Sequence, residues 1–478
     1  MIALTQARCF ILEIPEELLL GIFRYLEGKD IIRCASVCRH FSLMIAHSME
    51  MKYKIELSSD TLTDCPSTLP TNKRLSLLHR RRHALRKPTL QKYIITDALE
   101  TNIQSQILEG GIIASLVNMP FINSAASPSI KQRLHILPLP SHDREKAATL
   151  MDHPLDIPIY DLAMDPSQNL LVLTELHYYT SGPEQTTSID IHLHLRALGH
   201  PELAVNPAAG HPILAATLNT SFHISPPMIY GDVVALVIYH PQTTCLSGIG
   251  GPGRIWCELP LDEMSTYFSF VSDHAYIITD VFSPYPGGGR LQLFSFTGNS
   301  SPHKGGTSVD VLQTQRSPTH FASLELPAVH QSVTRRMVLH SATHSPSRHA
   351  PFGTPSAARL QLLTLHYATP VTRSFRFVID NGVFLRLLDD TAGSCQADKG
   401  KAPIIPWKKW GPGASRAFIR NDTQDLLRRH AHGRHLLLQD AGGLGNLGAQ
   451  RRRDRVEVVP WRTPVLEESW AWVLRGKC

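Results

Sequence analysis

The chain has 478 residues, of which 42% are hydrophobic and 18% are charged, and its formal net charge is +6 at pH 7. This length exceeds one ordinary core, so two or three domains are expected. The 34 prolines and 30 glycines predict many turns and few long helices, and so small a charge does not by itself indicate a nucleic-acid-binding protein.

Neither a secretory signal nor a metal-binding or redox cysteine motif is recognisable in the sequence. No apolar run approaches the roughly 20 residues that cross a bilayer, so we expect no membrane partner. The N-terminus meets acidic residues at once and lacks the features of a signal peptide. The eight cysteines form no CxxC pair. We therefore expect reduced thiols and a location in the cytoplasm, the nucleus or both.

Residues 11–50 are expected to fold as three short helices. Pro15 suits the first turn of a helix, Gly28 is expected to end that helix, and Asp30 can cap a second one. A third helix carries Phe41. Three helices in so few residues expose apolar surface that a partner can bury. The first helix has a wide apolar stripe, made of Leu18, Leu19, Ile22, Phe23 and Leu26.

The stretch IPEELLLGIFRYLEGKDIIRCASVCRHF, within residues 12–48, resembles an F-box. It departs from the usual pattern at Ile14, where Leu is commoner, and at Phe41, where Trp is more usual. The resemblance implies docking on the small adaptor subunit of an SCF ubiquitin ligase, which bridges to a cullin. The alternative is an ordinary helical hairpin whose leucines are all internal. The adaptor-binding residues that the resemblance implies are Ile14, Pro15, Leu18, Leu19, Ile22, Phe23, Leu26, Ile31, Val37, Cys38 and Phe41.

Residues 51–91 are expected to form a basic helical connector. The run NKRLSLLHRRRHALRKP, at 72–88, combines partial helical periodicity with a strong positive charge. Such a run can be a nuclear address or a phosphate-binding patch. The competing interpretation is a solvated helix face.

Residues 92–478 are expected to be strand-rich. IDIHLHLR, at 189–196, alternates with period 2, and NLLVLTEL, GDVVALVIYH, RLQLLTLHYA and VFLRLL also read as strands. At roughly 40–50 residues per blade, the region would accommodate a β-propeller of five to eight blades. Loops are expected around 297–320, 340–357 and 440–455, where Ser, Pro, Gly, Thr or Arg dominate. The fold class is therefore mainly β, with an N-terminal α-helical F-box and a propeller-like body.

Three segments of this body also resemble the C-terminal region of basidiomycete F-box proteins, which implies a fungal origin. They are DLAMDPSQNLLVLTEL, GDVVALVIYH and IIPWKKWGPGASRAF. No regular Trp-Asp or Gly-His signature marks individual blades, so WD repeats are not indicated.

Patterns that could carry chemistry all have structural explanations. GIGGPG, at 248–253, matches GxGxxG, but the following residues indicate a turn into another strand, not the helix of a dinucleotide site. His192 and His194 share one strand face and could bind a metal, although a polar outer face is the favoured interpretation. We therefore assign no catalytic residue, cofactor or metal ligand. Trp407, Trp410 and Arg416 are candidate target-binding residues, with the alternative that both indoles pack in the body.

Together these patterns predict a non-catalytic, substrate-recruiting F-box subunit of an SCF-type ubiquitin ligase. Its partners would be the SCF adaptor, a cullin through that adaptor, and an unknown target protein held by the β-rich body. The alternative is a nuclear or nucleic-acid-associated binding protein that uses the basic connector.

Overall fold

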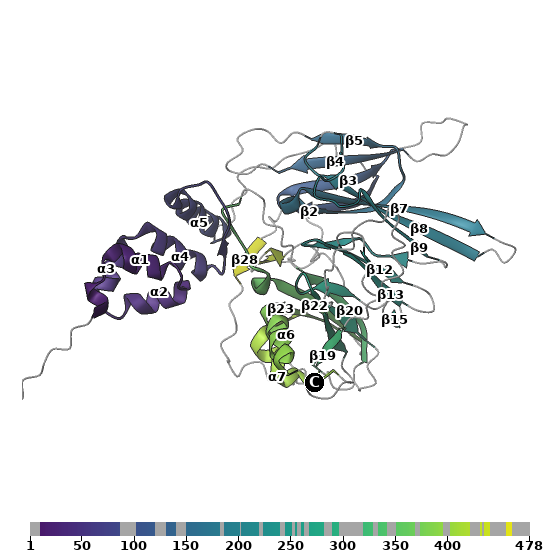
Figure 1. Cartoon of the computed structure of the whole chain (residues 1–478). Helices are drawn as coiled ribbons and strands as arrows, with labels where there is room; N and C mark the ends of the chain where they lie inside the picture. The colour runs from purple at the N-terminus through teal and green to yellow at the C-terminus, as the bar shows by residue number, and fades with distance from the viewer. Residues whose placement is uncertain are drawn as a thin grey trace, which may run out of the picture. The chain divides into compact units, whose positions relative to one another are not determined.

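The computed structural model describes helices and strands along most of the chain, in two compact units (Figure 1). One unit contains residues 1–93, 349–355 and 436–459, and the other contains 94–348, 356–435 and 460–478. Among the described residues, no helix is both long enough and apolar enough to cross a membrane. The described residues are 10–86, 102–119, 131–139, 150–181, 186–200, 202–218, 223–239, 244–250, 254–255, 260–261, 267–281, 289–295, 319–327, 333–341, 350–368, 373–394, 402–420, 431–432, 435–439 and 456–460.

The first unit is helical. Apart from the strand residues within 436–459, its elements are η1 (Phe10–Glu13), α1 (Glu16–Phe23), α2 (Gly28–Ala35), α3 (Arg39–His47), α4 (Met49–Ser59), β1 (Thr63–Asp64), α5 (Thr71–Arg86) and β21 (Phe352–Gly353). Pro15 immediately precedes α1, and its carbonyl oxygen accepts hydrogen bonds from the amides of Leu18 and Leu19. Ser48 caps α4, because its hydroxyl accepts a hydrogen bond from the amide of Met51 at 3.3 Å.

Two sequence-based expectations about helix ends were wrong. Gly28 does not end the first helix but begins α2. A Cβ at Gly28 would lie 2.4 Å from Cβ of Ser58, so a glycine is required where α2 meets α4. Asp30 lies inside α2, where it accepts a hydrogen bond from Arg33 at 2.7 Å, and the residue at the cap position is Glu27.

A short antiparallel ribbon ties a distant segment of sequence into this helical unit. Thr63 pairs with Gly353 and Asp64 with Phe352. Phe352 also packs on an apolar cluster that α4 and α5 share, formed by Tyr53, Leu57, Leu62, Leu75 and Leu78. The loop expected at 340–357 thus contains a paired strand, and the other two expected loops lie almost wholly outside the described residues.

The second unit is built from successive antiparallel sheets. Within the described residues, five of them follow one another along the chain. The first is β2 (Ile103–Glu109), β3 (Ile112–Asn118), β4 (Gln132–Pro138) and β5 (Met151–Leu155), and the second is β6 (Ile159–Asp165), β7 (Leu170–Ser181), β8 (Thr186–Ala197) and β9 (Ile213–Leu218). The third contains β10 (His223–Ile224), β11 (Met228–Tyr230), β12 (Val233–Tyr239), β13 (Thr244–Gly250), β14 (Arg254–Ile255) and β15 (Pro260–Leu261).

The fourth and fifth sheets include segments that are distant in sequence. The fourth contains β16 (Phe268–Phe270), β17 (Ala275–Asp280), β18 (Arg290–Ser295), β19 (Thr319–Glu325) and β24 (Ile404–Ile405), and the fifth contains β20 (Val333–Ser341), β22 (Leu360–Ala368), β23 (Arg373–Asp380) and β25 (Ser415–Arg420). Three further strands, β26 (Ala431–His432), β27 (His435–Gln439) and β28 (Val456–Pro460), form a small sheet. The turns η2 (Pro166–Gln168) and η4 (Ser356–Ala358) and the helices α6 (Gly382–Ser394) and α7 (Trp407–Ala414) complete the described elements.

Each sheet packs its face on the next sheet in sequence, and each of these interfaces has its own apolar core. Leu134 of the first sheet packs with Leu171 of the second. Val172 of the second shares a core with Leu236 of the third, and further cores join the third to the fourth and the fourth to the fifth. Face-to-face stacking of successive antiparallel sheets is the arrangement of a propeller. The body is strand-rich and propeller-like, which confirms the predicted fold class.

The strand predictions were confirmed at most positions and wrong at one. IDIHLHLR lies within β8. The short helical turn η2 precedes β7, and there the Asp165 carboxylate accepts a hydrogen bond from the Ser167 amide at 2.9 Å. The first three residues of GIGGPG, 248–250, end β13, and β14 pairs antiparallel with the last two of them. The next described element after the motif is thus a strand and not a helix. VFLRLL, predicted as a strand, forms the first half of α6, whose Phe384 lies in the core of the fourth and fifth sheets.

Candidate docking surface of the N-terminal helices

Helices α1 to α4 enclose one small apolar core. The rings of Phe23 and Phe41 meet edge to face, with centroids 5.5 Å apart and planes at 83°. The core is formed by Leu19, Phe23, Ile31, Phe41, Met44, Ile45 and Met51. This core is what holds four short helices together, because helices of 8 to 11 residues are marginal without tertiary packing.

The structure divides the predicted adaptor-binding residues into three groups. Leu19, Phe23, Ile31 and Phe41 are buried in the core. A second group is half-buried and packs against that core, and it consists of Ile14, Leu26 and Cys38. Pro15, Leu18, Ile22 and Val37 are exposed. Only the exposed group, with the edges of the half-buried one, has side-chain surface available for a partner.

The exposed residues of α1 and the turn after it follow a helical spacing. Leu18, Ile22 and Tyr25 are separated by four and three residues, which places them near one helix face. Their exposed fractions are 61%, 50% and 92%. We call these three residues the α1 apolar face. Sequence reasoning missed Tyr25, although its position seven residues after Leu18 was a signal that could have found it.

Other large apolar side chains of the same unit are also exposed. Ile32 projects from α2, Val37 lies in the turn between α2 and α3, and Leu43 lies on α3. Scattered exposed apolar residues are normal on soluble proteins. The observation that points to docking is therefore the helical spacing of the α1 apolar face above a filled core, and not the count of exposed residues.

The helices and their sequence match a known family model. The model is described as F-box-like, and it matches residues 11–52. Residues 11–52 are an F-box-like domain. The matched range includes α1 to α3 and the beginning of α4, and the expected range of 11–50 differs from it by two residues.

Comparisons over the rest of the chain carry less information. No curated protein matches the chain. Among solved structures, the chain is similar to an uncharacterized protein, lmo1340, from Listeria monocytogenes EGD-e, with 8% identity, a TM-score of 0.33, and coverage of 61% of this chain and 67% of that one. The fungal origin that the sequence suggested stays a prediction.

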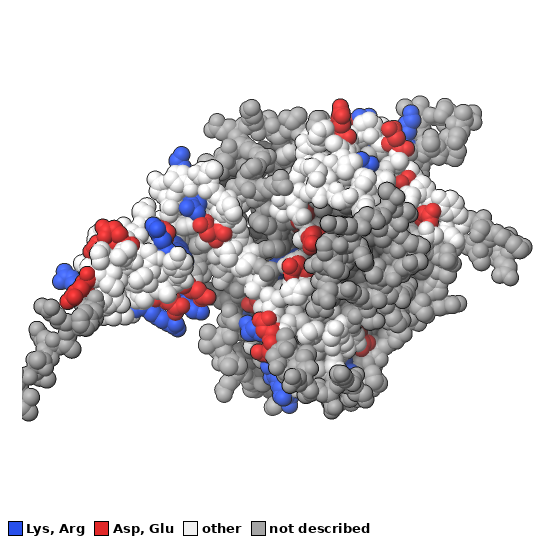
Figure 2. Space-filling model, in the orientation of Figure 1, with Lys and Arg blue, Asp and Glu red and all other residues white. Residues whose placement is uncertain are grey.

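Charged side chains surround the apolar residues of the F-box-like domain. Arg24 of the turn after α1 bonds Glu50 of α4 at 2.8 Å, and Lys29 pairs with Glu27 at 2.7 Å, which raises the pKa of the Lys29 ammonium. In the view of Figure 2, acidic and basic side chains are interspersed over the described helices. This mixture differs from the single-sign surface that a phosphate backbone selects.

The basic connector is partly neutralised by its own neighbours. Arg82 of α5 donates to Glu56 of α4 at 2.7 Å and to Asp60 at 3.2 Å. Hydrogen bonds to two acids hold this guanidinium against α4. Arg82 is therefore engaged within the unit, which weakens the interpretation of the whole run as a phosphate-binding patch.

A polar contact joins α4 to the ribbon strand β1. The Tyr53 hydroxyl donates to the Asp64 carboxylate at 2.8 Å, and Arg74 donates to both oxygens of that carboxylate at 2.8 and 2.7 Å. The Arg74 guanidinium also lies over the Tyr53 ring, 5.0 Å from its centroid. Burial, and then the bond to Asp64, raise the pKa of the Tyr53 phenol. This contact links α4, β1 and α5, the elements that follow the F-box-like domain in the first unit.

The predicted target-binding tryptophans lie in the body core. Trp410 is buried, and its indole N–H donates to the Glu325 carbonyl oxygen at 3.0 Å. Trp407 is half-buried and meets the rings of Phe377 and Trp410 edge to face, at 5.4 and 4.8 Å. Arg416 is half-buried on β25. The two indoles thus have a packing role, as the alternative interpretation expected, and expose little surface for a target.

Proposed function

We propose that this chain is a substrate-recruiting subunit of an SCF-type ubiquitin ligase. The F-box-like domain would bind the SCF adaptor and, through it, a cullin, while the propeller-like body would hold a target protein. An F-box-like domain joined to a propeller-like body is consistent with such a recognition subunit. In this role the chain performs no bond chemistry itself.

The observation that supports adaptor binding is that neighbouring side chains of α1 are divided between the core and the exposed surface. Leu19 and Phe23 fill the core, whereas Leu18 and Ile22 are exposed on the α1 apolar face. Burying one such aliphatic side chain contributes about 1.5–3 kcal/mol. Leu18 and Ile22 are 61% and 50% exposed, so the two together have about one side chain's worth of surface left to bury. That would strengthen binding by a factor on the order of 10 to 10², since 1.4 kcal/mol corresponds to about tenfold.

The contribution of the body would be proximity. A target bound to the body and an adaptor bound to the F-box-like domain belong to one assembly. Transfer of ubiquitin to the target then occurs at an effective concentration set by the assembly, not by diffusion from bulk solution. We expect the assembly to form in the cytoplasm, the nucleus or both.

The experiment is adaptor pull-down with the full chain carrying Leu18→Asp and Ile22→Asp. We expect adaptor and cullin to be lost, while crosslinked target remains bound to the body. The matched control is Leu108→Asp with Ile213→Asp, because these aliphatic side chains of β2 and β9 are also exposed. Adaptor binding that survives in the first variant, with its helices folded, would refute the proposed face.

Point variants suit this test better than removal of residues before Leu57. Such a truncation would cut through α4 and remove Tyr53, which packs with Leu75 and Leu78 of α5. The resulting chain would lose part of the cluster that also holds Phe352, so a change in target binding could reflect unfolding.

A further inference from the structure

Strands β7 and β8 bring Glu175 and three imidazoles onto one sheet face, together with Asp190, which lies opposite His177. Glu175 lies directly opposite His192, and Leu173 lies opposite His194. His177 follows Glu175 by two residues, and His194 follows His192 by two, so all four side chains project from the same face. The sequence pattern identified only the pair on β8. Pairing with β7 adds Glu175 and His177.

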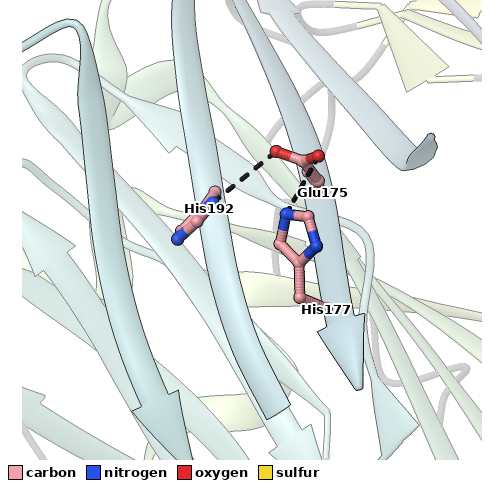
Figure 3. A group of neighbouring side chains, drawn as sticks. All are labelled: Glu175, His177 and His192. Atoms are coloured by element: carbon pink, nitrogen blue, oxygen red, sulfur yellow. Dashed lines mark ion pairs between the residues drawn. The ribbon is translucent and has the colours of Figure 1, made fainter. Parts of the chain in front are cut away.

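These side chains lie within bonding distance of one another (Figure 3). The Glu175 carboxylate is 3.0 Å from Nε2 of His177, through Oε1, and 3.6 Å from Nδ1 of His192, through Oε2. The side chain of Glu175 is 6% exposed, whereas those of His177 and His192 are 36% and 31% exposed. An ion from solvent could therefore reach the two imidazoles, while the carboxylate is held below them.

His194 fixes the position of that carboxylate. It is buried, which differs from the polar outer face that the sequence suggested, and its Nε2 lies 2.8 Å from Oε2 of Glu175. Arg196 approaches the other ring nitrogen at 3.5 Å. A neutral imidazole with its proton on Nε2 satisfies both contacts, because Nδ1 then accepts and Nε2 donates. Glu175 thus resembles a metal-binding carboxylate that an outer histidine orients.

On β7, Glu175 follows two apolar side chains that are buried. Leu171 and Leu173, which precede Glu175 on the same face of β7, belong to the core between the first and second sheets. The charged group therefore lies at the margin of an apolar core, where an unpaired charge would be unfavourable.

We propose that Glu175, His177 and His192 form a binding site for a divalent transition-metal ion such as Zn²⁺. The three ligand atoms all lie within 4.8 Å of one another. Tetrahedral zinc with ligands at 2.0–2.1 Å requires separations of about 3.3 Å between ligand atoms. The contacts of 3.0 and 3.6 Å involve the two different oxygens of Glu175. Binding therefore requires side-chain movements that bring one ligand atom of each residue from within 4.8 Å of one another to that separation.

The ligand set also selects the type of metal. Two imidazoles suit Zn²⁺, Cu²⁺ and Ni²⁺, whereas Mg²⁺ and Ca²⁺ prefer an all-oxygen environment. Three protein ligands leave the fourth position of a tetrahedral ion for water or for a donor from a bound partner. The competing explanation is an ion-pair network in which one or more histidines are protonated and no metal binds.

The experiment is calorimetric titration of the full chain with Zn²⁺, with Mg²⁺ as the comparison ion. We expect His177→Ala with His192→Ala to bind one equivalent of Zn²⁺ fewer than the natural chain. Glu175→Gln, which keeps the size of the side chain, should weaken that equivalent by at least about tenfold. Mg²⁺ should show no saturable binding, and Co²⁺ bound at the site should give the visible absorption of a tetrahedral ion.

The matched control is His274→Ala. His274 is exposed and pairs with Asp273 at 2.6 Å in the turn between β16 and β17. The substitution therefore removes a histidine–carboxylate pair that is remote in sequence from the proposed site. Its zinc stoichiometry should equal that of the natural chain. Equal stoichiometry and affinity in the double variant, or no saturable Zn²⁺ binding by the natural chain, would overturn the proposal. If the double variant fails to fold, the zinc titration of the single variant His192→Gln tests the site instead. Unchanged zinc affinity in that variant would overturn the proposal.

Discussion

Leu18 and Leu19 are adjacent in α1, yet their side chains have opposite environments. The side chain of Leu18 is 61% exposed, whereas that of Leu19 is 1% exposed and lies among Phe23, Phe41 and Met44. A helix turns about 100° per residue, so adjacent leucines need not share a face. One side chain stabilises the F-box-like domain, and the other is available to a partner.

This relationship predicts opposite effects of two alanine substitutions. Leu19→Ala should destabilise the F-box-like domain by about 2–5 kcal/mol, because it leaves a cavity in a small core. Leu18→Ala should change stability by no more than about 0.5 kcal/mol, while weakening adaptor binding. Hydrogen exchange of residues 16–47 measures the first effect locally, since all tryptophans lie outside residues 1–93. Equal exchange rates in the two variants would contradict the assignment of inner and outer leucines.

The Tyr53 contact predicts a local effect on the ribbon. Tyr53→Phe removes the hydroxyl that bonds Asp64 and also lies 3.4 Å from the Pro351 carbonyl oxygen. We expect a loss of about 0.5–1.5 kcal/mol. Exchange should accelerate at the Cys65 amide, which donates to Pro351 at 3.0 Å. The core of α1 to α3 provides the internal control, because faster exchange there as well would indicate general destabilisation instead.

How far the sequence predicted the structure depends on how local each signal was. The apolar stripe of the first helix and the alternation in IDIHLHLR are local signals, and the structure has the helix α1 and the strand β8 at these positions. The short apolar run VFLRLL is compatible with either a helix or a strand. In the structure it is helical, and Phe384 of α6 packs against the sheets. Gly28 was misread because its neighbour Ser58 is 30 residues away.

The candidate sites differ in the same way. The F-box-like pattern lies within one stretch of sequence, so its apolar residues were found, although the division into inner and outer side chains required the packed helices. Glu175 was missed because only strand register places it opposite His192. A period-2 pattern identifies the residues on one face of a strand, but it does not identify the strand that pairs with it.

Buried amides between the sheets provide a third prediction. Gln361 accepts from the Ser269 hydroxyl at 2.8 Å and donates to the Phe270 carbonyl oxygen at 3.0 Å, which joins the fifth sheet to the fourth. Gln361→Ala would leave buried groups unsatisfied, and each of these contributes about 1–3 kcal/mol of destabilisation. Urea unfolding followed by tryptophan fluorescence measures the loss, because Trp407 and Trp410, two of the six tryptophans of the chain, lie at this interface.

The matched control for Gln361 occurs in a related stretch of sequence. RLQLFSF and RLQLLTL place Gln292 and Gln361 at the same position. Gln292, however, is only half-buried and bonds Asp280 on the neighbouring strand at 3.2 Å. Gln292→Ala should therefore destabilise the body by less than about 1 kcal/mol. A loss as large as that of Gln361→Ala would argue against the inter-sheet contact as the cause.

His320 predicts how body stability depends on pH. Its ring stacks on Phe294 with centroids 4.7 Å apart, and burial lowers its pKa below the ordinary 6.5. The unfolded state therefore takes up a proton at a higher pH than the folded state does. Stability that is complete above about pH 6.5 should be lost as the pH falls through and below that value. His320→Gln, which does not titrate, should lose less stability between about pH 7.5 and 5 than the natural chain. Urea midpoints across this range test the sign, and an equal or steeper loss in His320→Gln would show that other groups govern the acid sensitivity of the body.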